Sequence, residues 1–184
     1  MRAGSARAGV AKMVEQAQLP TINGIDVTEL REYIESCRLD PSQADRNPVV
    51  VARWVGGTRA EVTSSLGGPP VYMGGADDPS ALGMVLRCLA ACDVEVVANK
   101  AALLGVQIED LSVEVRGYAN VGRYLGLDSD AGSGYQRIAY TIRLKTKGAT
   151  AEQLEEIRRA CLKGSPVADT LERAVAVELE FEGS

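Results

Sequence analysis

The sequence predicts an α+β protein, and three observations support this fold class. A long segment, residues 79–104, has apolar residues at helical spacing. Several shorter segments alternate apolar and polar residues, as strands do when one face is buried. From residue 48 onward the predicted order of elements is β-β-β-α-β-β-α-β, which is an α+β arrangement.

The first part of the chain predicts a helical extension. Residues 1–16 are rich in Ala and Gly and have the composition of a frayed or weakly helical segment. Residues 28–39 have helical spacing, and Thr28 is a candidate to cap the start of this helix. Residues 40–48 contain two prolines, three charges and no apolar run, so we expect a linker. We therefore divide the chain into an extension, residues 1–45, and one main domain, residues 46–184.

The main domain begins with a predicted meander of two or three antiparallel strands. Residues 48–55 are rich in β-branched side chains, and Gly56 and Gly57 are typical of a tight turn. A returning strand is expected at 59–66. A Gly-Gly-Pro-Pro turn then leads to a short extended segment at 71–73.

The helix predicted at 79–104 is the longest element of the chain. Pro79 suits its first turn, and Gly105 suits a left-handed residue just after its end. Twenty-six residues rising 1.5 Å each give a length of about 39 Å. The helix has no wide polar face, so we expect it to be covered from more than one direction. A second subunit could supply part of that cover.

The remaining elements follow the same two periodicities and are separated by turns that contain Gly or Pro. In chain order we expect a strand at 111–118, a glycine-rich loop at 120–134, a strand at 137–145, a helix at 151–163 and a strand at 174–181. Between the last two, Ser165 and Pro166 suit the N-cap and first position of a further short helix.

Composition excludes several classes of function. The chain has no histidine, which removes Ser-His-Asp and Cys-His catalysis and every His-ligated zinc site. Its 25 acidic and 20 basic residues give a net charge of -5, which disfavours nucleic-acid binding. No apolar run reaches the roughly 18 residues of a membrane helix, and no secretory signal is visible. We expect a cytoplasmic protein with reduced thiols that needs no metal or cofactor and binds neither nucleic acid nor membrane.

Few side chains suggest chemistry. Cys88 and Cys92 are four residues apart on the long helix and share a face, although a cysteine inside a helix is most often a small buried hydrophobe. Arg59 follows the Gly-Gly turn and is a candidate cation, with a solvated turn arginine as the alternative. Asp77 and Asp78 could form an acid–base or metal pair, or could complement the dipole of the helix that follows.

Taken together, these segments resemble the OsmC-like family, which includes the organic hydroperoxide resistance proteins. The resemblance covers about residues 22–182 and is carried by NGIDVTELREYIE, RWVGGTR, VYMGGADDPSALGMVLRCLAACDVEVV, YLGL, GYQRI and GSPVADTLERAVAVELE. It implies an OsmC-like fold, with antiparallel sheets wrapped around long central helices in an intertwined homodimer.

The resemblance also implies a site. Active members reduce organic hydroperoxides with two cysteines, an arginine that activates the first cysteine and a glutamate that orients the arginine. Cys92 matches the first cysteine and Arg59 is the best match to the arginine. Ser165 stands where the second, resolving cysteine would be, and Gly83 stands where the glutamate would be. Two of the four parts are therefore replaced.

The replaced cysteine decides how turnover could proceed. A serine hydroxyl cannot form a disulfide with the sulfenic acid of an oxidised cysteine. Reduction of the Cys92 sulfenic acid would then need an external thiol, or else Cys88 or Cys161. Bridging Cys88 to Cys92 would require local distortion, because side chains one helical turn apart are nearly parallel.

Three hypotheses follow from these residues. The first is a thiol-dependent peroxidase that acts through Cys92 in oxidative-stress defence, with a hydroperoxide as substrate and an unidentified thiol as reductant. The second is a non-catalytic dimer that binds a small apolar molecule. In the third, Cys92 is purely structural.

Overall fold

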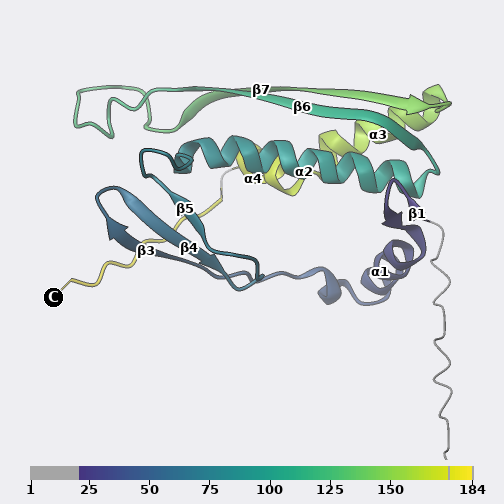
Figure 1. Ribbon diagram of the computed structural model, residues 1–184, viewed down its shortest axis with the longest axis horizontal. Coiled ribbons are helices and arrows are strands. Elements are labelled where there is room, and N and C mark those ends of the chain that lie inside the picture. The colour runs from purple at the N-terminus through teal and green to yellow at the C-terminus, as the bar shows by residue number, and fades with distance from the viewer. Residues whose placement is uncertain (1–20, 174, 184) are drawn as a thin grey trace, which may run out of the picture.

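The computed structural model describes residues 21–173 and 175–183, so the helical tendency expected for residues 1–16 lies outside the described residues. Its central element is the long helix α2 (Ala81–Leu103). Figure 1 shows α2 between the long hairpin of β6 (Gln107–Ala119) and β7 (Tyr135–Lys147) on one side and a small sheet on the other. This mixture of helices and antiparallel sheets confirms the predicted α+β class.

Both ends of α2 have well-defined caps. Ser80 is the N-cap, and its hydroxyl accepts a hydrogen bond from the backbone N–H of Gly83. Pro79 therefore precedes the N-cap, and the prediction that it lies in the first turn of the helix was wrong. At the other end Gly105 has a φ of +73°, and the N–H of Val106 donates to the carbonyl of Ala101 at 2.8 Å. This pattern is a Schellman motif, and it confirms the predicted role of Gly105.

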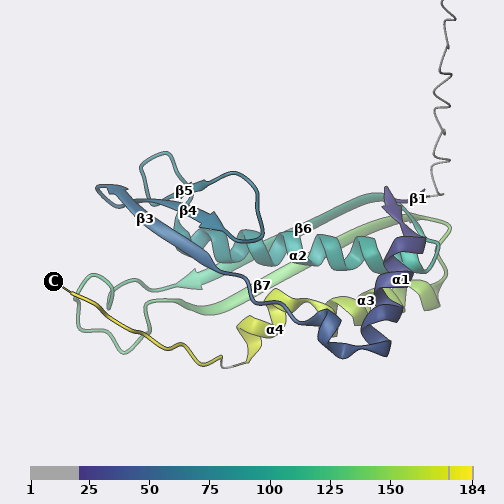
Figure 2. The same ribbon diagram turned by 90° about the horizontal axis from the view of Figure 1, so that it is seen from below.

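One face of α2 is buried against the hairpin and helix α3 (Ala151–Gly164). Figures 1 and 2 show α3 and the short helix α4 (Pro166–Glu172) lying alongside α2. The buried face of α2 repeats every four residues, as one face of a helix does. Its buried side chains include Leu89, Asp93, Val97 and Ala101. Val97 and Ala101 form a core cluster with Val106, Ile157 and Cys161.

The β6–β7 hairpin is longer than predicted. Its register pairs Val113 with Ile142 near the centre, and pairing continues to Gln107 and Lys147. The predictions at 111–118 and 137–145 covered only the clearly alternating parts. Backbone hydrogen bonding extends the ladder past the point where side-chain alternation stops being regular, through two register shifts.

Two predictions about helix starts have different outcomes. Ser165 caps α4 with Pro166 in its first turn, as predicted. In α1 (Val27–Leu39), by contrast, the cap is Asp26, whose carboxylate accepts from the N–H groups of Thr28 and Glu29. Thr28 was the wrong choice, because Asp is a better N-cap than Thr and stands two residues earlier.

The N-terminal described region carries α1, a two-residue hairpin of β1 (Thr21–Ile22) and β2 (Ile25–Asp26), and a 3₁₀ turn, η1 (Pro41–Ala44). Asn23 joins this region to the main domain: its side chain donates to the carbonyl of Val106 at 3.0 Å and accepts from the N–H of Ile108 at 2.9 Å. The division of the chain at residue 45 remains a prediction.

The predicted meander is present as β3 (Val50–Gly56), β4 (Arg59–Ser64) and β5 (Val71–Met73), in the order β3-β4-β5. Most of the apolar side chains of this sheet are exposed. The single tryptophan, Trp54, is 77% exposed. The sheet therefore offers apolar surface that the described part of this chain does not cover.

No strand forms over residues 175–181, the described part of the strand predicted at 174–181. Residues 175–183 form no regular element, and Val177 is 91% exposed (residue 174 lies outside the described residues). Alternation of apolar and polar residues makes a segment suitable for a sheet, but a strand also needs a neighbouring backbone for its hydrogen bonds. Within the described chain this segment has no such neighbour.

Candidate functional site

Cys92 and Ser165 lie against each other. Cys92 is half-buried in the middle of α2, and Ser165 is 2% exposed at the junction of α3 and α4. The Ser165 hydroxyl donates to the Cys92 sulfur, with 3.5 Å between Oγ and Sγ. The same oxygen accepts the backbone N–H of Ala168 at 3.4 Å, as an N-cap does. Packing of α3 and α4 on α2 thus joins two residues that are 73 positions apart in sequence.

Asp93, the residue after Cys92, is completely buried. Neither of its carboxylate oxygens has a hydrogen-bond partner among the described residues. A buried carboxylate without a partner is unfavourable, because it loses its hydration and receives nothing in exchange. Its negative charge also adds to burial in raising the pKa of Tyr140 on β7 and of Cys161 on α3.

The other cysteines differ in their environments. Cys161 is buried, and burial followed by the charge of Asp93 raises the pKa of its thiol above the usual value. It is therefore a protonated thiol at neutral pH and a poor nucleophile. Cys88 is exposed one turn before Cys92, and Cys37 is half-buried on α1. All four cysteines are free thiols.

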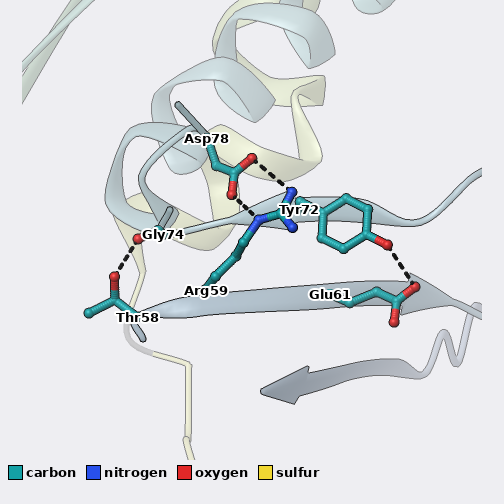
Figure 3. Close-up of polar contacts among 6 residues, drawn as sticks. All are labelled: Thr58, Arg59, Glu61, Tyr72, Gly74 and Asp78. Atoms are coloured by element: carbon teal, nitrogen blue, oxygen red, sulfur yellow. Dashed lines mark hydrogen bonds and ion pairs between the residues drawn. The ribbon is translucent and has the colours of Figure 1, made fainter. Parts of the chain in front are cut away.

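Arg59 is held by a carboxylate of the loop before α2, and not by one at position 83, where the resemblance placed the orienting glutamate. Its Nε donates to Oδ2 of Asp78 at 2.7 Å, and its guanidinium lies 4.1 Å from the centre of the Tyr72 ring. Figure 3 shows the guanidinium between these two side chains, with the Tyr72 hydroxyl directed toward Glu61. The ion pair raises the pKa of Arg59 and lowers the pKa of Asp78.

The structure does not bring Arg59 and Cys92 together. Within the described part of the chain, no hydrogen bond or ion pair joins them. Arg59 is bound to Asp78, in the segment just before α2, whereas Cys92 lies about 16 Å along the helix axis from its first residue, Ala81. A contact between Arg59 and Cys92 would therefore have to involve a second copy of the chain or a movement of the small sheet.

Sequence reasoning missed Asp78 as the partner of Arg59. It considered Asp77 and Asp78 only as an acid–base or metal pair, or as charges near a helix start. A carboxylate does meet Arg59, but from the loop before α2 and not from position 83. The neighbouring Gly75 supports this arrangement, because a Cβ there would collide with the Asp78 carboxylate. An acidic pair next to two glycines was the available signal.

An apolar groove lies between β7 and α3, and Cys161 and Val97 of α2 are among its lining residues. Its volume is about 660 Å³, and its lining includes Ile142, Leu154 and Leu162. The polar residues of its lining are Tyr140 on β7, Arg158 on α3 and Glu172, the last residue of α4. Cys92 is not among the residues that line this groove. The groove and the Cys92–Ser165 contact are therefore separate features.

No group of three or more Cys, Asp or Glu side chains in residues 21–173 and 175–183 is arranged to hold a metal ion. Over the same residues, no helix combines the length and apolar character needed to cross a membrane.

Comparison with known proteins identifies the class. The sequence model of the OsmC-like protein family matches residues 74–180, which include α2, the hairpin, α3 and α4. The chain belongs to the OsmC-like protein family. No curated protein is a detectable sequence relative of this chain.

Solved structures support the same fold. An OsmC-like protein from Mycoplasma pneumoniae is similar with a TM-score of 0.58 and 17% identity, over 70% of this chain and 89% of that one. An OsmC-like protein of unknown function from Vibrio cholerae has a TM-score of 0.56 and 11% identity, over 70% of this chain and 95% of that one. At these identities the likeness concerns the fold alone.

Proposed function

We propose that this OsmC-like protein is a thiol-dependent peroxidase that reduces organic hydroperoxides through Cys92. The observation that carries the proposal is the contact between Ser165 Oγ and Cys92 Sγ at 3.5 Å. The resemblance assigns these two positions to the peroxidatic and resolving residues, and the structure has them in contact. Cys92 is also only half-buried, and the proposed reaction requires that a small molecule can reach its sulfur.

The proposed reaction needs two substrates. The Cys92 thiolate attacks the terminal peroxide oxygen, the O–O bond breaks, and Cys92 becomes a sulfenic acid. The departing alkoxide takes a proton from water and leaves as the alcohol. An external monothiol then displaces water and forms a mixed disulfide with Cys92. A second monothiol attacks that disulfide, which releases the Cys92 thiol and a disulfide of the reductant.

The reductant is external because the chain offers no suitable internal thiol near Cys92. Ser165 occupies the resolving position, and its hydroxyl cannot form a disulfide. The raised pKa of Cys161 keeps this buried residue protonated. Cys88 shares a helix face with Cys92, where the nearly parallel side chains oppose a bridge.

We propose that the active form is an intertwined homodimer. The exposed apolar residues of the β3–β5 sheet and the alternating segment 175–183 are the surfaces that a second copy would cover. That copy would also supply the neighbouring strand that residues 175–183 lack. In such a dimer Arg59 of a second copy is the cation that would approach Cys92. The free thiols fit a reducing compartment, and we therefore place the protein in the cytoplasm.

One observation favours a second candidate function. The groove between β7 and α3 is large and mainly apolar, which suits a small apolar ligand. A binding protein of this kind would not need Cys92, because Cys92 does not line the groove. The two functions can thus be separated by substitutions at different places.

The test is consumption of cumene hydroperoxide with a monothiol reductant. We compare the wild type with Cys92→Ala and with Cys88→Ala, a matched change one turn away on the same helix. The expected result is loss of consumption in Cys92→Ala only, with a sulfenic acid trapped at Cys92 in the wild type. Equal consumption by the wild type and Cys92→Ala would exclude the peroxidase and leave the binding protein.

A further inference from the structure

We propose that Ser165 donates a hydrogen bond to the Cys92 thiolate and thereby activates Cys92. Ser165 stands at the resolving position, but it cannot resolve an oxidised Cys92 as a cysteine would. This inference deepens the proposed function and rests on it for the identity of the reaction. It assigns Ser165 a polar role in place of the covalent role that a cysteine would have there.

The direction of the hydrogen bond follows from the thiolate, which has no proton and can only accept. Ser165 Oγ accepts the backbone N–H of Ala168, so one of its lone pairs is occupied. Its single proton is then free to point at Cys92, and Oγ and Sγ are 3.5 Å apart, within the range of a hydrogen bond to sulfur. Ser165 is 2% exposed, so water does not compete for that proton. A hydroxyl held in this way donates to a thiolate without having to reorient.

The surroundings of Cys92 explain why such a donor matters. The next residue, Asp93, is a buried carboxylate without a hydrogen-bond partner among the described residues, and a nearby negative charge disfavours a second one. Arg59 is bound to Asp78 within the same chain. Ser165 is the side chain that the described structure shows donating to Cys92.

The same contact has a consequence after oxidation. A hydroxyl next to the sulfenic acid of Cys92 can hydrogen-bond to it but cannot condense with it. The sulfenic acid therefore persists until an external thiol reaches the half-buried sulfur. Ser165 thus makes Cys92 a single-cysteine centre whose second substrate is a small thiol.

The test measures alkylation of Cys92 and needs no peroxide. Iodoacetamide is added at neutral pH, and mass spectrometry follows modification at each cysteine in the wild type, Ser165→Gly, Ser165→Ala and Ser165→Thr. Glycine is well tolerated at an N-cap, so Ser165→Gly removes the hydroxyl with little effect on α4. Cys88, which is exposed on the same helix, is the reference thiol in every sample.

Alkylation of Cys92 should be slower by roughly three- to tenfold in Ser165→Gly and Ser165→Ala. The effect is this small because loss of the donor has two opposing results. The Cys92 thiolate becomes scarcer, but each remaining thiolate is a stronger nucleophile. Ser165→Thr, which keeps a hydroxyl, should restore the rate to within about a factor of two. Cys88 should react equally in all four proteins.

Two results would overturn the proposal: unchanged Cys92 alkylation in both variants without a hydroxyl, or a slow rate that Ser165→Thr fails to restore. If Cys92 alkylation is unchanged without the hydroxyl but hydroperoxide is still consumed, the activating role of Ser165 is wrong and the peroxidase proposal stands. Conversely, a wild type that consumes no hydroperoxide but shows the expected alkylation pattern would remove the peroxidase and leave Ser165 as the donor.

Discussion

Arg59 donates its Nε proton to the carboxylate of Asp78 across 2.7 Å, a contact that joins the second strand of the small sheet to the loop before α2. The Arg59 side chain is 44% exposed and that of Asp78 is 17% exposed. Asp78 fixes one edge of the guanidinium, and Tyr72 covers one of its faces. The N–H groups that are not bound to Asp78 remain available to an incoming group, which is the property required of an activating arginine.

The Arg59–Asp78 pair gives the first prediction. Asp78→Asn should slow the reaction of Cys92 with cumene hydroperoxide several-fold, because Arg59 loses the charge that orients it. Asp77→Asn is the matched control, since Asp77 precedes it and has no ion pair with Arg59. Stopped-flow measurement of sulfenic acid formation compares the two variants. Identical rates for both would show that Asp78 does not act through Arg59 on Cys92.

A second prediction concerns Ser165→Cys. A new thiol at this position should form a disulfide with Cys92 when hydroperoxide is added, because Ser165 already touches the Cys92 sulfur. The variant should gain turnover with a dithiol reductant, and loss of the serine cap should cost only about 0.5–2 kcal/mol. Non-reducing peptide mapping detects the bridge. A folded variant without the bridge would mean that the two sulfurs do not meet during the reaction.

The third prediction uses Trp54 as a reporter of assembly. Trp54 is exposed in the single chain but lies on the sheet that we expect a second copy to cover. In a homodimer its fluorescence should be shifted to shorter wavelength, and dilution should shift it back as the dimer dissociates. Sedimentation on the same samples gives the mass. A folded monomer at micromolar concentration, with an exposed Trp54 spectrum, would contradict the dimer.

A fourth prediction concerns acid sensitivity and Glu155 on α3. Ion pairs with Arg158 and Arg159 lower the pKa of Glu155 from 4.5 to about 2. Because the folded-state pKa is lower than the unfolded one, this stabilisation is present above pH 4.5 and is lost as the pH falls toward about 2. Glu155→Gln should therefore lose less stability than the wild type over that interval. Glu35→Gln, which breaks an exposed pair with Arg38, is the control for thermal unfolding at each pH.

The parts of the fold that sequence predicted are those that depend on local patterns. The period of residues 81–103 specifies a helix without reference to the rest of the chain, and alternation does the same for most of β7. The pair Ser165 and Pro166 specifies a helix start, and the structure has one there. The segment 174–181 shows the limit of such patterns, because its strand character depends on a neighbour that the described chain does not supply.

The candidate site was less accessible to sequence reasoning. Cys92 and Ser165 are 73 residues apart, and only the family resemblance put them in one site. Arg59 and Asp78 are 19 residues apart, and the acidic pair near two glycines does not by itself indicate which side chain Asp78 meets. Contacts of this kind arise from the packing of whole elements, which single-residue patterns do not encode.

The exposed C-terminal segment has a practical consequence for anyone who produces this protein. Residues 175–183 are the last described part of the chain to leave the ribosome, and we expect them to enter a sheet only when a second copy is present. Until then Val177, Leu179 and Phe181 are open to solvent and favour aggregation. Low expression temperature and a purification tag at the amino terminus should thus give more soluble protein than a tag fused after Ser184.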